Sequence, residues 1–204
     1  MRSPWAREYA RTPNAYIWGT RASALARRVS ALLPAGARVL DLGCGEGRDS
    51  VFFAERGFDV TGVDIARSGL SKAERLASGR GVRVHWVRGD IGAPDARRLV
   101  VGLFDLVYSC GAIHYVPRAL RTRLFARLRT HTREHGLHAH VVFTDRAVYV
   151  EKGEQIDYFA PGELAGLFAD WPILAREQRL IRCGQDGTVH CHSVEQLVAR
   201  SPGR

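Results

Sequence analysis

The amino-acid sequence predicts an α/β protein with a doubly wound sheet, in which helices cover both faces. Between residues 38 and 144, short apolar runs alternate with segments of helical periodicity, a pattern typical of parallel strands joined by helices. The first apolar run ends in a glycine-rich turn, and an Asp-Gly pair near the C-terminus predicts an antiparallel hairpin. We therefore expect a seven-stranded sheet that is mostly parallel, with the C-terminal hairpin at one edge.

Hydrophobic spacing places the elements in order along the chain. Residues 1–19 are aromatic and irregular, and leucines and a valine at helical spacing predict a helix over 21–33. Strands are expected over 38–42, 58–63, 82–88, 104–109 and 137–144, with helices over 48–56, 68–78, 94–100 and 117–130 between them. The last third predicts a helix from Pro161 to Asp170, followed by hairpin strands over 173–183 and 188–199.

Length and composition predict one globular domain, because the chain has 204 residues and 46% of them are hydrophobic. No apolar run reaches the roughly 20 residues of a membrane span, and the N-terminus lacks the apolar stretch of a signal peptide. Cys44, Cys110, Cys183 and Cys191 are widely spaced, which predicts reduced thiols and no zinc site built from cysteines. We expect a cytoplasmic protein, either a monomer or a homodimer.

The formal net charge of +9 raises the question of a nucleic-acid partner. Only Lys72 and Lys152 among the 30 basic residues are lysines, and the arginines are scattered along predicted helices. No block of roughly five or six like charges occurs. A solvated basic surface is therefore favoured over a nucleic-acid groove.

A glycine-rich loop is the strongest functional signal in the chain. Residues 39–47 read Val-Leu-Asp-Leu-Gly-Cys-Gly-Glu-Gly, an apolar strand that runs into three alternating glycines. Glycines let a ligand approach the main chain closely, at the start of the helix that follows from Arg48. A second apolar strand ends in Asp64, whose carboxylate suits the two hydroxyls of an adenosine ribose.

The spacing of the loop distinguishes between adenosine cofactors. A nicotinamide fingerprint, Gly-x-Gly-x-x-Gly, would need glycine at the position of Arg48. Asp41 adds negative charge, which would attract a sulfonium and an ammonium group and repel a pyrophosphate. Both observations favour S-adenosylmethionine.

Four motifs follow one another in the chain: Asp41-Leu-Gly-Cys-Gly-Glu-Gly47, Asp64, Gly89-Asp90-Ile91 and Phe104-Asp-Leu-Val-Tyr-Ser109. In order and spacing they resemble the motifs of class I S-adenosylmethionine-dependent methyltransferases, over residues 37–144. The resemblance implies a Rossmann-like fold, S-adenosylmethionine as cofactor and S-adenosylhomocysteine as product. It divides a single domain, 1–204, into an N-terminal lid and helix (1–33), a cofactor-binding core (37–144) and an acceptor-side segment with the hairpin (145–200).

The motifs and the aromatic lid give the expected cofactor contacts. These are Trp18, Asp41, Gly43, Cys44, Gly45, Gly47, Arg48, Asp64, Ile65, Asp90, Ile91 and Ser109. Asp90 and Ile91 fit an adenine clamp, in which a carboxylate accepts from the exocyclic amine and a main-chain N–H donates to the ring. A turn or cap role is the alternative for Asp90, and a helix-dipole role is the alternative for Asp49.

The segment from Ser109 to Tyr115 indicates the kind of methyl acceptor. Enzymes that methylate exocyclic amines of bases place Asn/Asp/Ser-Pro-Pro-Tyr/Phe here, and this chain does not. A small-molecule acceptor is therefore expected, with His114 and Tyr115 as candidate catalytic residues that position or deprotonate it. The alternative is that one of the two packs beneath the following helix.

The C-terminal third resembles the tellurite-resistance methyltransferases, which are relatives of the thiopurine enzymes. The resemblance rests on Gln155-Ile-Asp-Tyr-Phe159, Pro161-Gly-Glu-Leu164 and Asp170-Trp171 before the hairpin. Where that family has a catalytic histidine, this chain has Ile181. A two-residue turn at Asp186-Gly187 would pair Cys183 with His190 and Ile181 with His192, so His190 is a further candidate catalytic residue. An exposed edge-strand face is the alternative.

Two groups of histidines resemble metal-binding patterns, but the secondary structure expected around them does not suit a metal site. His131-Thr-Arg-Glu-His135 matches an inverted zinc-protease pattern, and His138 and His140 share one face of a predicted strand. The zinc-protease pattern needs a continuing helix, whereas Gly136 ends this one and a strand follows. No metal is therefore expected.

The sequence thus predicts methyl transfer from S-adenosylmethionine to a small-molecule acceptor by in-line displacement. A thiol or another soft nucleophile is the preferred acceptor, and Tyr9, Tyr16 and Trp18 are the expected lid. Two alternatives stay open: an RNA methyltransferase, and a non-catalytic protein that binds S-adenosylmethionine.

Overall fold

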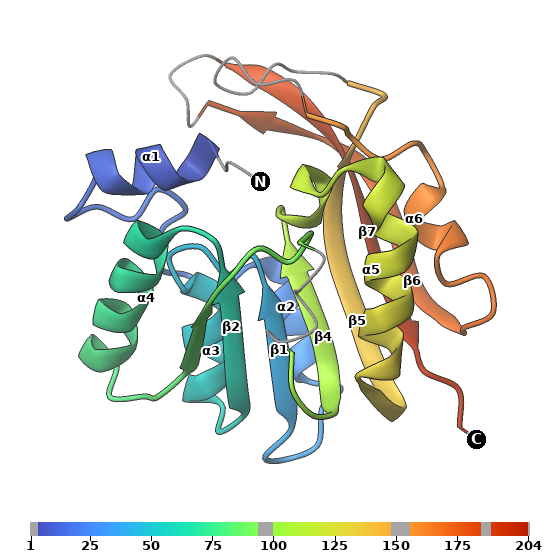
Figure 1. Ribbon diagram of the computed structural model, residues 1–204, viewed down its shortest axis with the longest axis horizontal. Helices are drawn as coiled ribbons and strands as arrows, with labels where there is room; N and C mark the ends of the chain where they lie inside the picture. The colour runs from blue at the N-terminus through green and yellow to red at the C-terminus, as the bar shows by residue number, and fades with distance from the viewer. Residues whose placement is uncertain (1–3, 94–99, 148–155, 185–188, 204) are drawn as a thin grey trace.

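A seven-stranded sheet organises the chain in the computed structural model, which describes residues 4–93, 100–147, 156–184 and 189–203. Its strand order is β3-β2-β1-β4-β5-β7-β6 (Figure 1). The first five strands in this order run parallel, whereas β7 is antiparallel to both β5 and β6. The expected mostly parallel sheet with an antiparallel C-terminal hairpin is confirmed.

The strands are β1 (Arg38–Leu42), β2 (Asp59–Asp64), β3 (His85–Arg88), β4 (Phe104–Cys110), β5 (Thr132–Thr144), β6 (Ile173–Cys183) and β7 (His190–Arg200). The helices are α1 (Pro4–Arg11), α2 (Ala24–Ser30), α3 (Arg48–Glu55), α4 (Arg67–Gly79), α5 (Arg118–Thr130) and α6 (Glu163–Gly166), with a 3₁₀ turn, η2 (Ile113–Tyr115). No helix in the described part of the chain is long and apolar enough to cross a bilayer.

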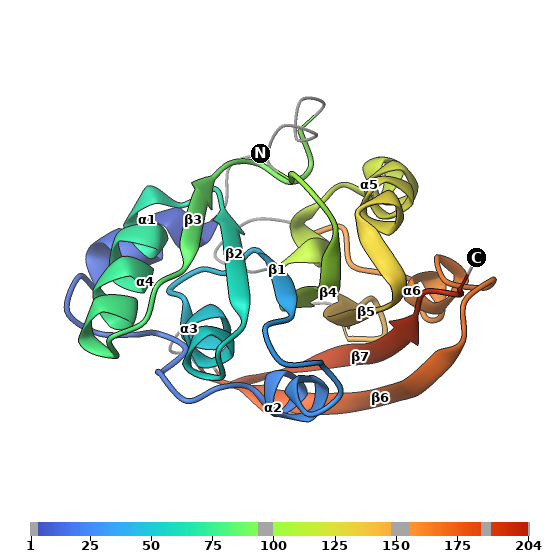
Figure 2. The same ribbon diagram turned by 90° about the horizontal axis from the view of Figure 1, so that it is seen from below.

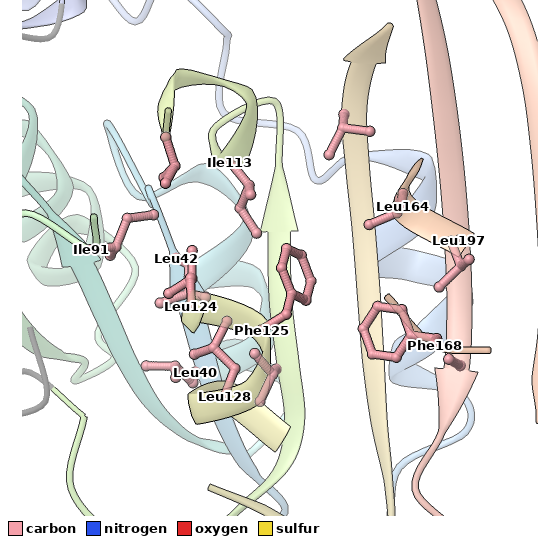
Figure 3. Packing of buried hydrophobic residues seen from close by; sticks show 14 of the residues in the cluster. Leu40, Leu42, Ile91, Ile113, Leu124, Phe125, Leu128, Leu164, Phe168 and Leu197 are labelled. Atoms are coloured by element: carbon pink, nitrogen blue, oxygen red, sulfur yellow. The ribbon is translucent and has the colours of Figure 1, made fainter. Parts of the chain in front are cut away.

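Successive residues of β1 point to opposite faces of the sheet and build two separate cores. On one face, Leu40 and Leu42 cluster with Leu124 and Leu128 of α5, as Figure 3 shows. On the other face, Val39 belongs to a cluster that includes Leu25 and Val29 of α2 and Phe53 of α3. Figure 2 shows α2 and α3 on the face opposite to α5, so the sheet is doubly wound.

The start of β5 differs from expectation. The helix before it ends at Thr130, and β5 begins at Thr132 rather than at residue 137. Thr132 pairs with Phe104 of β4, and the register shifts before Leu106 pairs with Leu137. This irregularity accommodates His135 at a φ of 59°. In the inverted zinc-protease pattern, His131 therefore caps the end of α5, and Thr132 to His135 lie on a strand, which removes the helical geometry that the pattern requires.

Two short helices, α1 and α6, also differ from expectation. Residues 4–11 form the helix α1, because Trp5 and Tyr9 are one helical turn apart and bury their rings against Ala66. The helix expected over 161–170 is shorter, since α6 ends at Gly166 and three-residue turns continue the chain to Trp171. The helix expected near 94–100 and the hairpin turn at 185–188 fall on residues that lie largely outside the described part.

Candidate functional site

The carboxyl ends of β1, β2 and β4 meet at one edge of the sheet, where two adjoining cavities open. Both are lined by Trp5, Tyr9, Gly43, Gly111 and Tyr115. The smaller cavity continues to Val63, Asp64, Ile65, Gly89, Asp90, Ile91 and Ala112. The larger cavity has a volume of about 250 Å³ and runs from the glycine loop to the β6–β7 hairpin.

The glycine loop presents bare main chain to these cavities. The N–H groups of Gly43 and Cys44 both donate to the carbonyl of Val63, at 2.8 and 3.1 Å, which turns the loop across the end of β2. At Gly45, which has a φ of 54°, a Cβ would stand 2.8 Å from the hydroxyl oxygen of Tyr9. A side chain here would collide with the aromatic wall, so glycine is required on both steric and conformational grounds.

Asp64 is fixed by the loop that it supports. Its Oδ2 accepts from the N–H of Gly45 at 2.8 Å, and its Oδ1 accepts from the N–H of Ala66 at 2.7 Å. Burial raises the pKa of this carboxyl above its ordinary value, and the main-chain hydrogen bonds oppose the rise. Asp64 lines the smaller cavity. Each of its carboxylate oxygens can accept a second hydrogen bond, which leaves acceptor capacity for a ribose.

Asp41 is a buried acid at the loop end of the larger cavity. Burial raises its pKa to about 7, although the hydroxyl of Ser50 donates to its Oδ2 at 2.6 Å. A carboxyl of this kind is stabilised in its charged form by a cationic ligand. Its environment therefore suits the sulfonium and ammonium charges that the sequence assigns to this place.

Arg48 and Asp49 form a fixed pair on the wall of the larger cavity. The Arg48 guanidinium donates to both oxygens of Asp49, at 3.1 and 3.0 Å. Asp49 also accepts from the Tyr108 hydroxyl at 2.7 Å and from the Ser23 N–H at 2.7 Å. These bonds tie the start of α2 to α3 and β4, so Asp49 has a structural role here whether or not it also contacts a cofactor.

Asp90 and Ile91 line the smaller cavity, as the adenine-clamp prediction requires. The Oδ1 of Asp90 also accepts from the N–H of Gly92 at 2.8 Å. This is the local turn bond of the alternative prediction, so the turn orients the carboxylate at the cavity wall.

Ser109 lies differently from the other predicted cofactor residues, because its hydroxyl points into the core. Its Oγ is 3.0 Å from Nδ1 of His140, whose Nε2 is 3.0 Å from Nδ1 of His138. Nε2 of His138 is 2.8 Å from Oγ1 of Thr132. Burial lowers the pKa of both histidines, to about 3 for His140, so both are neutral and the chain of bonds is internal to the core.

Tyr115 faces the two cavities, whereas His114 packs inside the protein against Phe143 of β5. Tyr115 lines both cavities, and its hydroxyl oxygen accepts from the indole N–H of Trp5 at 2.5 Å. His114 is fully buried and stacks on Phe143 at 4.4 Å between ring centroids. Burial, and then the charge of Arg121, lowers the pKa of His114 to about 3. It lies behind the Phe143 ring and not among the residues that line the cavity.

Aromatic side chains from the N-terminus cover the cofactor end of the site. Trp5 packs on Trp18 with 4.8 Å between ring centroids, and Tyr9 and Trp18 line the larger cavity with it. Tyr16 instead donates its hydroxyl proton to the carbonyl of Lys72. Trp5 was not predicted as a wall residue, although its helical spacing from Tyr9 is a signal in the sequence.

A buried ion pair, also missed, holds this segment to the loop. The Lys72 ammonium pairs with the carboxylate of Glu46 and donates to the carbonyl of Thr12 at 2.8 Å. Glu46 also accepts from the N–H of Trp18 at 3.3 Å. The signal was Lys72 itself, a lone lysine on the side of α4 that carries buried alanines and a leucine.

The hairpin forms the far wall of the larger cavity. Arg179, Ile181, Val194 and Gln196 line it together with Val141 and Phe143 of β5. The predicted register is confirmed, because Ile181 pairs with His192 and Cys183 with His190. His192 stacks on Phe143 at 4.2 Å. His190 and His192 lie further along the same face and are not among the residues that line the cavity.

Comparisons with known proteins agree with this geometry. Residues 39–136 match the family model of a methyltransferase domain. The chain is 36% identical over 124 residues to trans-aconitate 2-methyltransferase of Deinococcus radiodurans. This alignment covers 56% of this chain and 42% of that protein. It is 25% identical over 159 residues to Hemagglutinin 1 of Eikenella corrodens, covering 78% and 51%. The chain thus spans about half the length of these curated relatives or less.

The fold is shared with solved methyltransferase structures. TehB from Haemophilus influenzae superposes with a TM-score of 0.75 at 20% identity, over 86% of this chain and 61% of that chain. In its strand order, its glycine loop and the match over residues 39–136, the chain is similar to class I S-adenosylmethionine-dependent methyltransferase domains. At 20% identity the likeness to TehB shows the shared fold alone.

Proposed function

We propose that this protein transfers the methyl group of S-adenosylmethionine to a small molecule held at the hairpin end of the larger cavity. The observation that carries the proposal is the junction of the two cavities. The smaller one contains the predicted adenosine residues Asp64 and Asp90, and the larger one extends from the glycine loop to the hairpin. Cofactor and acceptor would thus meet beside Gly43 and Tyr115, which line both cavities.

The residues present fit the cofactor. Gly111 lines both cavities, and a Cβ built on it meets no atom within 4 Å, so its main chain faces open space. Asp41 supplies a buried carboxyl at the loop end, with a pKa of about 7 that a cationic ligand would lower. Asp64 and Asp90 are oriented by main-chain hydrogen bonds at the other end.

S-adenosylmethionine supplies an already activated methyl group on its sulfonium. The protein therefore has to orient the acceptor in line with that group and keep water away. Trp5, Tyr9 and Trp18 cover the site with large rings that exclude solvent. Tyr115, held by the Trp5 indole, stands at the junction where the two reactants would meet.

We place a soft nucleophile, such as a thiol, first among acceptors. Among the described residues that line the larger cavity there is no histidine. His114 is buried behind Phe143 with a pKa lowered to about 3, so it is a poor general base for an alcohol or amine. A thiol needs little base assistance, because its ordinary pKa of about 8.5 is close to neutrality.

A large side chain at the hairpin end of the larger cavity tests whether the methyl acceptor binds there. We expect Ile181→Trp to reduce release of S-adenosylhomocysteine at least tenfold, measured with a panel of small thiols, phenols, amines and carboxylates. Affinity for S-adenosylmethionine, measured by calorimetry, should change by less than about threefold, because Ile181 lies at the hairpin end of the larger cavity, opposite the glycine loop, and does not line the smaller cavity. Leu180→Trp is the matched control, since Leu180 is the neighbouring residue and is 68% exposed.

Equal turnover in the Ile181→Trp and wild-type proteins would contradict the location of the acceptor. Turnover on folded RNA with no turnover on any small molecule would overturn the proposed substrate class. Tight cofactor binding without turnover on either would favour a non-catalytic binding protein.

A further inference from the structure

Three side chains with metal-binding atoms converge near the end of the hairpin. Sγ of Cys183 and ring nitrogens of His190 and His192 all lie within 4.8 Å of one another. Cys183 is directly opposite His190 in the β6–β7 register, and His192 follows on the same face of β7. No metal site is expected from the sequence, because its cysteines are far apart, and strand pairing is what assembles this cluster.

The ligand types select a particular class of ion. A thiolate and two imidazoles are soft and borderline donors, which suit Zn²⁺ and Co²⁺ and do not suit Mg²⁺ or Ca²⁺. With Zn–S near 2.3 Å and Zn–N near 2.0 Å, donor atoms in a tetrahedral site lie roughly 3.3 to 3.6 Å apart. The cluster therefore needs only small side-chain rotations to reach this geometry.

The surroundings hold the cluster in place and leave it accessible. His192 is buried and its ring is stacked on Phe143 at 4.2 Å. Its Nε2 is 2.7 Å from Nε2 of His190, so the two ring nitrogens already point at one another. Cys183 and His190 are half-buried, which gives an ion a path from solvent.

We infer that Cys183, His190 and His192 bind one zinc-type divalent cation through Sγ and two ring nitrogens. Three protein ligands leave a fourth coordination position for water or another donor, as in zinc sites that act on small molecules. The cluster lies on the same sheet face as Ile181 and Val194 of the larger cavity. Figure 1 shows this end of the hairpin curling over the edge of the sheet where the cofactor residues lie. The site does not depend on the proposed methyl transfer.

Metal binding at this site has a defined proton balance. Both imidazoles bind as neutral ligands, and the Cys183 thiol must give its proton to solvent to become a thiolate. Each ion bound therefore releases one proton from the thiol, and metal affinity should rise with pH.

Co²⁺ is the probe that tests the inference, because it absorbs light and a thiolate ligand adds a charge-transfer band in the near ultraviolet. Titration of the full chain, after treatment with a chelator, should show one equivalent of Co²⁺ with this band, displaced by Zn²⁺. Cys183→Ser should lose the band, and His190→Ala should weaken Co²⁺ binding at least tenfold. Cys191→Ser is the matched control, because Cys191 is exposed and points to the other face of β7.

The inference is overturned if the wild-type protein shows no thiolate band, or if the band survives in Cys183→Ser. Loss of the band in Cys191→Ser alone would assign the metal to a different thiol. Circular dichroism of each variant establishes that it is folded before its titration is interpreted.

Discussion

Asp41 shows how one buried residue can link ligand binding to pH. Its pKa is raised to about 7, mainly by burial, from an ordinary value of 3.8. Because the folded protein binds this proton more tightly than the unfolded chain, Asp41 favours folding most at low pH. That contribution is lost as the pH rises from about 4 to about 7.

Binding of a cationic ligand should lower the pKa of Asp41 and favour its charged form. We expect S-adenosylmethionine binding near neutral pH to release a proton, and its affinity to rise across about pH 6 to 8, because the ligand favours the charged carboxylate. Calorimetry in two buffers of different ionisation enthalpy measures the proton count. Asp41→Asn should bind more weakly and should lack this released proton, whereas an unchanged proton count in that variant would assign the effect to another group.

At the residue scale, the sequence predicted positions better than it predicted side-chain partners. The glycines and Asp64 could be assigned because their spacing follows from one strand, one turn and one helix. The side-chain directions of Ser109 and His114 could not be predicted, because they depend on packing against α5 and Phe143, which are distant in sequence.

At the scale of elements, α4 is joined to the glycine loop and the N-terminal segment through the ion pair of Lys72 and Glu46. Both side chains are almost completely buried. Removing one partner of a buried pair leaves a charge without compensation, which costs far more than removing a partner at the surface. The pair therefore stabilises the arrangement of the N-terminal segment on the glycine loop.

We expect Lys72→Met to lower the free energy of unfolding by about 3 kcal/mol, because it leaves the Glu46 carboxylate buried. Urea denaturation measures this loss. Arg80→Met, which removes an exposed pair with Glu55, should cost less than about 1 kcal/mol. Adding Glu46→Gln to Lys72→Met should recover part of the loss, and a further loss of similar size would contradict this account of the pair.

Elements with strong periodicity and clear boundaries were predicted closely, as for β1, α3, α5 and β6. The hairpin register followed from the two-residue turn alone. The start of β5 was misplaced because His135 and Gly136 read as a helix end, whereas they belong to an irregular strand. α1 was missed because a short amphipathic helix takes its stability from the surface on which it packs.

At the scale of the whole molecule, the strand order brings together the four segments that follow β1, β2, β3 and β4, which are separated in the chain by up to about 70 residues. The central parallel strands supply the predicted cofactor residues, and the antiparallel hairpin supplies the far wall of the larger cavity. The sequence predicted this arrangement through its motif order. The volume between the hairpin and the loop, and hence the shape of the acceptor, depends on packing that no local pattern encodes.

The most direct test of the central claim is calorimetric binding of S-adenosylmethionine to wild-type, Asp64→Ala and Asp59→Ala proteins. Asp59, at the exposed start of the same strand, is the matched control. Asp64→Ala removes the proposed ribose acceptor and the Gly45 hydrogen bond, and each charge-assisted bond is worth about 1.5 to 3 kcal/mol. We predict at least a roughly tenfold loss of affinity in Asp64→Ala and little change in Asp59→Ala. Undiminished binding by a folded Asp64→Ala protein would contradict the assignment of the cofactor site.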